Sequence, residues 1–304
     1  MKKEKGALNH KGIYIAMLLT FMIFSYGCGE NRPSTMNYRS GTRGVEINFA
    51  QSSPPDQIYV GSGENKMPVN IEVRNVGAES CSNAKIFLSG YDPSIIPLPT
   101  VRDVPKLEGK EESKNPSGSL EYLTIGEPTI NLPNGVDAMD IRLMATLCYD
   151  YMTRASTNVC IDPNPSKPGS RACTPQKSYS MSGGQGGPVS VTSIEQDSGV
   201  GNVVFKFTIK NTGGGEVIEK GNVAGCMGID FSKKDVVYVT GGTLSNKNME
   251  CTPSKVRLVN GEGLVVCKVS GLNTQDNAYT TTVQLNLDYG YKYSTIKSVQ
   301  IRRM

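Results

Sequence analysis

Short runs in which apolar and polar residues alternate make up much of the chain after residue 44. Two of these runs, residues 69–77 and 205–213, are near-copies, and each ends in Asn-x-Gly. Because successive side chains of a strand point to opposite faces, each run predicts a strand with one face on a core and the other in water. Asn-x-Gly is typical of a turn. This region has no convincing helical period, so the sequence predicts an all-β protein.

A second pair of similar segments lies further along the chain. Residues 147–151 (LCYDY) are similar to residues 287–291 (LDYGY), and residues 159–161 are similar to residues 299–301. The offset is 140 residues, against 136 for the first pair of segments, and the order is the same. Two such matches indicate a tandem repeat of one β-module.

The repeat sets the predicted domain boundaries. We expect β-sandwich modules at residues 44–162 and 188–304, joined by a linker at residues 163–187. The linker is so rich in Pro, Gly and Ser that no packed strand is expected there. About seven short strands in roughly 115 residues are typical of an immunoglobulin-like sandwich. In the second module, Asn260-Gly261 predicts a tight hairpin.

The repeated motifs resemble a known kind of module. Alternating strands that end in Asn-x-Gly, together with a terminal hairpin that carries Leu-x-Tyr-x-Tyr, resemble the CARDB-like adhesion modules of bacterial and archaeal surface proteins. The resemblance covers both modules, about three quarters of the chain. It implies two tandem immunoglobulin-like β-sandwiches in a prokaryotic surface protein.

The N-terminal segment has the composition of an export signal. Residues 1–11 carry four Lys against one Glu, and residues 12–24 are uncharged and mostly apolar. The apolar stretch from residue 13 to residue 27 is shorter than the roughly 20 residues that span a bilayer, and it fits the apolar region of a cleaved signal. We therefore expect a signal peptide at residues 1–27.

The residues at the expected cleavage point, Ser25-Tyr26-Gly27-Cys28, resemble the lipobox of prokaryotic lipoproteins. Gly27 and Cys28 match that motif, whereas Ser25 replaces the usual Leu and Tyr26 replaces a small residue. The resemblance implies lipidation of Cys28, a tether at residues 28–43, and a protein held on the outer face of the cell membrane. The alternatives are an ordinary secretory signal, which would release the protein, and an uncleaved N-terminal segment that holds it.

Charge and histidine content exclude several function classes. Removal of residues 1–27 lowers the formal net charge from +4 to +1, and no Lys/Arg-rich run remains. Nucleic acid is therefore not an expected partner. The single His, His10, lies within the predicted signal. A mature chain without imidazole excludes Ser-His-Asp triads, Cys-His dyads and His-ligated zinc.

Neither the carboxylates nor the tyrosines form a motif of a site. Most carboxylates near turns are expected to be solvated, and no Asp-rich loop has the ligand spacing of a calcium site. The repeated tyrosines are expected in the core and on sheet faces; carbohydrate stacking is the alternative role. The carboxylates concerned are Asp150, Asp162, Asp230, Asp235 and Asp288, and the tyrosines are Tyr149, Tyr151, Tyr289, Tyr291 and Tyr293. We predict no catalytic residue, cofactor or metal.

The cysteines favour an oxidising compartment. Beyond Cys28, the candidates for disulfides are Cys81, Cys148, Cys160, Cys173, Cys226, Cys251 and Cys267. A hairpin centred near Arg154 would pair Cys148 with Cys160. The competing scheme pairs Cys160 with Cys173 and Cys81 with Cys148. Cys251 and Cys267 flank the Asn260-Gly261 hairpin and are expected to pair, which leaves Cys226 over.

These observations together predict a non-enzymatic, exported and lipid-anchored surface protein that acts in adhesion, as a scaffold or as an interaction module. Its expected partners are the membrane, through the anchor, and other envelope proteins or surface polysaccharide. The alternative is a carbohydrate-binding accessory protein of the cell envelope.

Overall fold

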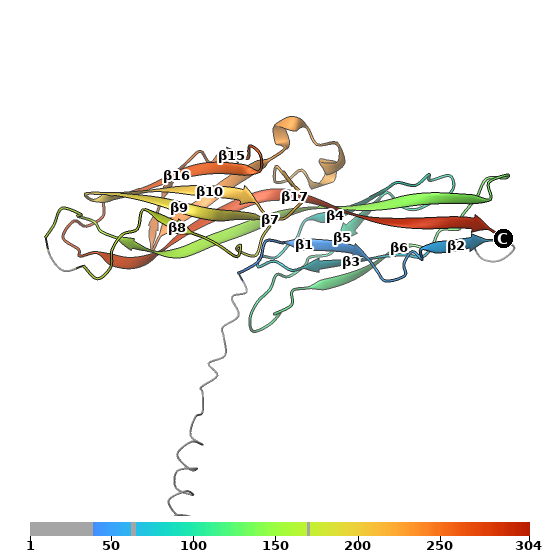
Figure 1. The fold of residues 1–304 in the computed structure, drawn as a ribbon, viewed down its shortest axis with the longest axis horizontal. Coiled ribbons are helices and arrows are strands. Elements are labelled where there is room, and N and C mark those ends of the chain that lie inside the picture. Colours follow the sequence, from blue (N-terminus) through green and yellow to red (C-terminus); the bar gives the residue numbers. More distant parts are fainter. Residues whose placement is uncertain (1–38, 62–64, 169–170) are drawn as a thin grey trace, which may run out of the picture. The chain divides into compact units, whose positions relative to one another are not determined.

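The computed structural model describes residues 39–61, 65–168 and 171–304, which belong to one compact unit, Asn37–Met304. This unit is all-β, as the alternation predicts, and includes two short 3-10 helices, η1 (Val223–Gly228) and η2 (Phe231–Lys233) (Figure 1). Its strands are β1 (Val45–Phe49), β2 (Gln57–Val60), β3 (Val69–Asn75), β4 (Ala84–Ser89), β5 (Val101–Val104), β6 (Leu120–Gly126), β7 (Ala138–Ile161), β8 (Ser178–Ser180), β9 (Val189–Gly199), β10 (Asn202–Asn211), β11 (Glu216–Ile218), β12 (Val236–Leu244), β13 (Lys247–Asn248), β14 (Glu250–Thr252), β15 (Lys255–Arg257), β16 (Glu262–Ser270) and β17 (Tyr279–Arg303).

Two long strands form the centre of the unit. β7 has 24 residues and β17 has 25, and they pair antiparallel along their length (Figure 1). The pairing extends from Ala138 opposite Arg302 to Ile161 opposite Tyr279. Both strands belong to a sheet whose main path has the order β13-β12-β17-β7-β4-β5. β2, β11 and β15 pair with members of this sheet, and β2 lies parallel to the end of β17.

Two smaller sheets pack against this central sheet, and their orders are β1-β3-β6 and β14-β16-β10-β9-β8. The near-copies seen in the sequence are β3 and β10, and alternate side chains of both strands are buried as predicted. Ile71 and Val73 of β3 belong to the same core as Phe205 and Phe207 of β10. The apolar face of each small sheet is thereby removed from water.

The two predicted modules share the central sheet. Residues 44–162 contain β1–β7 and residues 188–304 contain β9–β17, but β7 pairs with β17 over both halves. Ile301, in the second predicted module, pairs with Met139 and with Ile58 of the first. The module boundaries stay a prediction, and the core of each half includes residues from the other half's long strand.

The hairpin expected near Arg154 is wrong, because β7 passes through this residue without a turn. The stretch Met152-Thr153-Arg154-Ala155-Ser156-Thr157-Asn158 contains neither Gly nor Pro. β-branched Thr side chains favour a strand there. The corresponding part of β17 is also continuous.

The segment at residues 163–187 is more ordered than expected. It contains the short strand β8, which pairs with β9, although the composition predicts no packed strand. Gln185 is buried, and its side chain donates to the Val191 carbonyl and accepts from the Val191 N–H, at 3.0 and 2.9 Å. The Gly186 carbonyl accepts from the Ala78 N–H at 2.8 Å. The end of the predicted linker is therefore fixed against both halves.

The Asn260-Gly261 hairpin is confirmed. Asn260 and Gly261 have φ angles of 53° and 76°. Val259 and Glu262 exchange main-chain hydrogen bonds across them at 2.7 and 3.1 Å. Two consecutive positive φ angles are what a two-residue type I′ turn requires, and Asn-Gly is the preferred sequence.

Candidate functional site

The repeated sequence motifs meet at the middle of β7 and β17 and form the same hydrogen bonds twice. In the first half, the Asn75 side-chain oxygen accepts from the Gly77 N–H at 3.1 Å and from the Tyr151 hydroxyl at 3.2 Å. In the second half, Asn211 accepts from the Gly213 N–H at 3.3 Å and from the Tyr291 hydroxyl at 3.0 Å. The sequence offsets of 136 and 140 thus correspond to equivalent positions in space.

The amide nitrogens of these Asn residues complete the equivalence. Asn75 donates to the Glu79 carbonyl and Asn211 donates to the Gly215 carbonyl, both at 2.8 Å. The N–H groups of Glu79 and Gly215 donate to the hydroxyl oxygens of Tyr151 and Tyr291, at 3.2 and 2.7 Å. Each Asn-x-Gly turn is therefore bound to a tyrosine of a long strand.

The glycine of each Asn-x-Gly motif is required by the tyrosine beside it. A Cβ atom on Gly77 would lie 2.1 Å from the Tyr151 hydroxyl oxygen. On Gly213 it would lie 2.6 Å from the Tyr291 hydroxyl oxygen. No real Cβ approaches backbone or a fixed ring this closely, so larger residues would displace the turn.

The other tyrosine of each Leu-x-Tyr-x-Tyr motif binds the first strand of its half. The Tyr149 hydroxyl accepts from the Val45 N–H at 3.1 Å, and the Tyr289 hydroxyl accepts from the Val189 N–H at 3.4 Å. Tyr289 also shares a hydrogen bond of 2.7 Å with the Thr153 hydroxyl. β1 and β9 therefore begin on the same face of the central sheet.

The strand register relates the halves by a pseudo-two-fold axis. Tyr149 pairs with Tyr291 and Tyr151 pairs with Tyr289, so Asp150 and Gly290 lie opposite each other at the centre. The ring centroids of these two tyrosine pairs are 5.8 and 6.4 Å apart, distances typical of favourable aromatic contacts. We call these four tyrosines the tyrosine junction.

The tyrosine junction is buried in the core. Its four side chains are at most 3% exposed, as expected for core residues. Burial raises the pKa of Tyr291 to about 12, and it holds the pKa of Tyr149 and Tyr289 well above the ordinary value. The hydroxyls therefore stay protonated at neutral pH. They act as neutral hydrogen-bond donors and acceptors, and they do not form a platform for carbohydrate.

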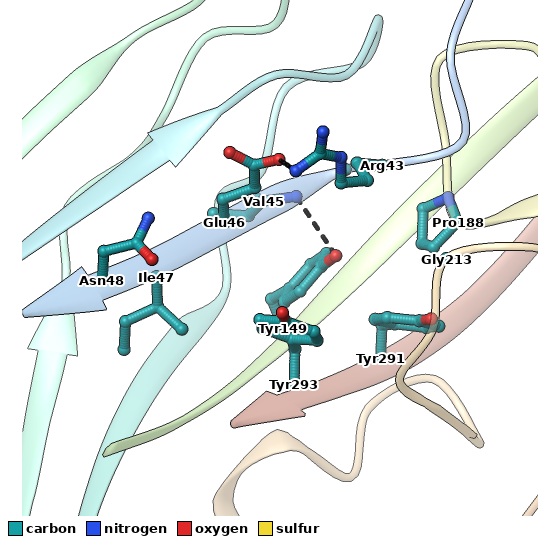
Figure 2. A pocket seen from close by; sticks show the side chains of 11 residues that line it. Arg43, Val45, Glu46, Ile47, Asn48, Tyr149, Pro188, Gly213, Tyr291 and Tyr293 are labelled. Carbon is teal, nitrogen blue, oxygen red and sulfur yellow. Dashed lines mark hydrogen bonds and ion pairs between the residues drawn. The ribbon is translucent and has the colours of Figure 1, made fainter. Parts of the chain in front are cut away.

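A small cavity lies between the junction and the edge of β1 (Figure 2). Its volume is about 90 Å³. The lining includes Tyr149, Tyr291 and the 38% exposed Tyr293, and the Arg43–Glu46 ion pair lies at its rim (Figure 2). Pockets for drug-sized ligands have about 300–1,000 Å³. The cavity is large enough for a few waters.

The lining of this cavity contains no nucleophile that is activated by a base. Its titratable groups are three tyrosines, an arginine and a glutamate. Glu46 is the one carboxylate among the lining residues and forms an ion pair with Arg43, whereas glycoside hydrolysis requires two carboxylates. The arrangement can hold water or a small polar group, and it offers no acid and base pair.

The carboxylates considered in the sequence have structural partners. Asp150 accepts from the Asn83 side chain and the Gly221 N–H, at 2.7 and 2.9 Å. Asp288 and Asp162, which are both buried, form ion pairs with Lys220 and Arg171 at 3.0 and 2.8 Å. In contrast to the expected solvated positions, these two lie inside.

The remaining carboxylates shape turns. Asp230 is the N-cap of η2 and accepts from the Ser232 N–H at 2.7 Å. Hydrogen bonds from the Ser232 side chain and from this N–H lower the pKa of Asp230. Asp235 has a positive φ of 58°. Within residues 39–61, 65–168 and 171–304, no group of three His, Cys, Asp or Glu residues is placed to hold a metal ion.

Six of the candidate cysteines form three disulfides in the described part of the chain, Cys148–Cys226, Cys160–Cys173 and Cys251–Cys267. The last two are pairs that the spacing suggested. Cys226, expected to be left over, binds Cys148. The alternative pairs of Cys148 with Cys160 or Cys81 are wrong; Cys148 and Cys160 lie on the same continuous strand, about 40 Å apart at 3.3 Å per residue.

These disulfides indicate an extracellular or otherwise oxidising environment. Cys81 keeps a free thiol and is 1% exposed. Desolvation raises the pKa of this thiol to about 12, so it is inert at neutral pH.

Cys28, His10 and the predicted signal lie outside the described residues. Among the residues that the structure describes, no helix is long and apolar enough to cross a membrane. Neither the known protein families nor the curated proteins include a match to this sequence.

The junction was only partly accessible from the sequence. Repetition of Asn-x-Gly and Leu-x-Tyr-x-Tyr marks its residues, but nothing in the sequence shows that the two motifs bind each other. The two motifs occur in equal number, since each Asn-x-Gly at a strand end is followed further along the chain by one Leu-x-Tyr-x-Tyr. This equal number is a signal that the two motifs belong together.

Proposed function

We propose that this protein is a non-enzymatic surface protein, exported and attached to the outer face of the membrane through a lipid on Cys28. Its two halves are duplicated immunoglobulin-like sandwiches related to CARDB-like adhesion modules. They serve as a scaffold or adhesion unit that contacts other envelope components through loops and sheet edges. Because sandwich folds host many functions, the fold class alone does not carry the proposal.

The tyrosine junction carries this proposal. The same Asn-Tyr hydrogen bond occurs in both halves, as Asn75–Tyr151 and Asn211–Tyr291. Each of these bonds joins one of the two smaller sheets to the central pair of β7 and β17. Buried tyrosines whose hydroxyls form these hydrogen bonds cannot contact a substrate. The described cavity also lacks an acid and base pair. A role in holding a fixed shape fits this use of residues better than catalysis does.

The cysteine pairing supports the lipid anchor on Cys28. Three disulfides use six of the eight cysteines, and the free thiol of Cys81 is buried. Cys28 therefore has no exposed partner thiol in the described part of the chain. Cys28 and Cys81 are the two cysteines left over, and a lipid on Cys28 would leave the buried Cys81 as the single free thiol without an intermolecular disulfide.

Mass spectrometry of the N-terminal peptide tests the anchor. We expect the mature protein to begin at Cys28 with the mass of a lipid added, and to partition into detergent. The C28A variant should lose both properties, whereas C81A should keep them. An unmodified Cys28, or cleavage elsewhere, would contradict the lipid anchor.

The alternative partner is surface polysaccharide, bound by exposed aromatic side chains. The junction tyrosines are excluded from this role by burial. The most exposed aromatic side chains of the described residues are Tyr59, Tyr122 and Phe231, at 52%, 57% and 75%. Binding to purified envelope polysaccharide that Y59A or F231A abolishes would favour this alternative.

A further inference from the structure

The three-stranded sheet has an unpaired edge where its counterpart carries another strand. Its order is β1-β3-β6, and within the described residues no strand pairs with the outer side of β6. The Asn75/Asn211 equivalence makes β3 the counterpart of β10, and β6 the counterpart of β16. In that second half, β14 covers β16 and is joined to it by Cys251–Cys267. The repeat thus shows that an edge of this geometry accepts a further antiparallel strand.

The main-chain groups on the free edge of β6 can be assigned from the register. The Asn75 N–H donates to the Ser119 carbonyl at 2.9 Å, and β3 pairs with β6 from there. Because bonded and non-bonded pairs alternate in an antiparallel ladder, Glu121 and Leu123 direct their N–H and C=O groups to β3. Those of Leu120, Tyr122 and Thr124 point away from it.

The side chains at these three positions are also exposed. Leu120 is 46% and Tyr122 is 57% exposed, and Thr124 is exposed as well. An edge that combines unpaired main-chain groups with exposed apolar side chains is a template for strand addition.

We propose that β6 pairs antiparallel with β6 of a second copy of this chain, about a two-fold axis at Tyr122. In this register each Tyr122 lies opposite the other, and Leu120 lies opposite Thr124. All the outward N–H and C=O groups of the three residues are then paired between the copies. The two three-stranded sheets become one continuous sheet of six strands. This proposal does not rest on the proposed function or on the lipid anchor.

Charge selects both the partner and the register. With Tyr122 opposite itself, Glu121 faces Leu123 of the other copy, and no like charges are opposed. A shift that places Glu121 opposite Glu121 is disfavoured by repulsion. The opposite shift removes the Tyr122 pair and places Leu120 opposite Gly126. The β6 sequence is therefore complementary to itself in one register, as an isologous interface requires.

The experiment measures the oligomeric state of the mature protein, made from the full chain, by sedimentation equilibrium over a wide concentration range. We expect a monomer–dimer equilibrium. Y122K places two ammonium groups opposite each other and should raise the dimer dissociation constant at least about ten-fold. L264K is the matched control, because Leu264 of β16 is the exposed residue at the equivalent position, and it should leave the dimer unchanged.

Charge exchange identifies the register. Y122K mixed with Y122E should form a heterodimer, whereas each variant alone should be monomeric at the same concentration. Unchanged circular dichroism and thermal unfolding of both variants show that the fold is intact. A monomeric wild-type protein, a dimer that survives Y122K, or failure of the mixture to associate would each overturn the proposal.

Discussion

Tyr151 and Tyr291 each satisfy two main-chain or side-chain groups at the base of an Asn-x-Gly turn. Each hydroxyl donates to an Asn oxygen and accepts from a main-chain N–H, so each residue connects a long strand to a turn of a small sheet. A side chain with this double role cannot be replaced by one that is merely apolar and of similar size.

We predict that Y151F and Y291F each lower the free energy of unfolding by about 1–3 kcal/mol, because a buried N–H and an Asn oxygen lose their partner. Y293F is the control. Tyr293 is 38% exposed, and its change should stay within about 0.5 kcal/mol. Urea unfolding measures all three. Equal effects of the three variants would contradict the role of the junction hydroxyls.

Cys81 makes stability sensitive to alkaline pH. Its pKa is about 12 in the folded protein against 9.0 for an ordinary thiol, so the unfolded chain loses this proton first as pH rises. Stability should therefore be unaffected below about pH 9 and should fall between about pH 9 and 12, by up to about 1.4 kcal/mol per pH unit for this group. The C81A variant should show a smaller fall in urea unfolding over this range. An identical pH dependence in both proteins would contradict the assignment.

At the scale of elements, the strands and the hairpin follow from local patterns and the long central pair does not. Alternation predicts the strands β3 and β10, and the Asn260-Gly261 dipeptide predicts a hairpin turn. Both features can be predicted because they depend on neighbouring residues in the sequence. The prediction of a hairpin near Arg154 depends on Cys148 and Cys160 lying six residues on either side of it, and it is wrong because β7 continues through this residue. Whether a stretch of polar, β-compatible residues turns or continues depends on β17, which is distant in sequence.

The Cys148–Cys226 disulfide also depends on an element that is distant in sequence. Cys226 lies in η1, on a connection with no alternation, and only the tertiary arrangement brings that connection over the buried Cys148. Local spacing could suggest Cys160–Cys173 and Cys251–Cys267, whose separations are 13 and 16 residues. A separation of 78 residues leaves no such signal.

These separations also predict how much each disulfide contributes to the stability of the folded protein. By chain entropy, Cys148–Cys226 should contribute about 4.5 kcal/mol, and Cys160–Cys173 about 3 kcal/mol. We expect the double variant C148S/C226S to lower the denaturation midpoint more than C160S/C173S does, with both proteins compared in non-reducing buffer. The reverse order would show that local packing, rather than loop length, decides the contribution.

At the scale of the whole molecule, the shared long strands couple the two halves. β7 and β17 contribute buried residues to one continuous core that includes both small sheets. A chain of two independent modules connected by a free linker would lack these shared strands, and its halves could unfold one after the other.

We therefore predict a single cooperative thermal transition for residues of both halves. Y151F and Y291F, which change different halves, should each shift that whole transition to lower temperature without splitting it. Differential scanning calorimetry, with the calorimetric and van't Hoff enthalpies compared, measures this. Two separate transitions, each shifted by only one of the variants, would show that the halves unfold independently.

The long strands that the two halves share also affect when each half can finish folding. The end of β17, Val299 and Ile301, lies beside Ile141 and Met139 of the first half and beside β2. During synthesis the sheet of the first half therefore cannot be completed until residues 158 to 162 positions further along the chain have been made. Contacts so distant in sequence form slowly. A sheet that is completed only when β17 is available keeps the chain unfolded for longer, which suits the export that we propose for this protein.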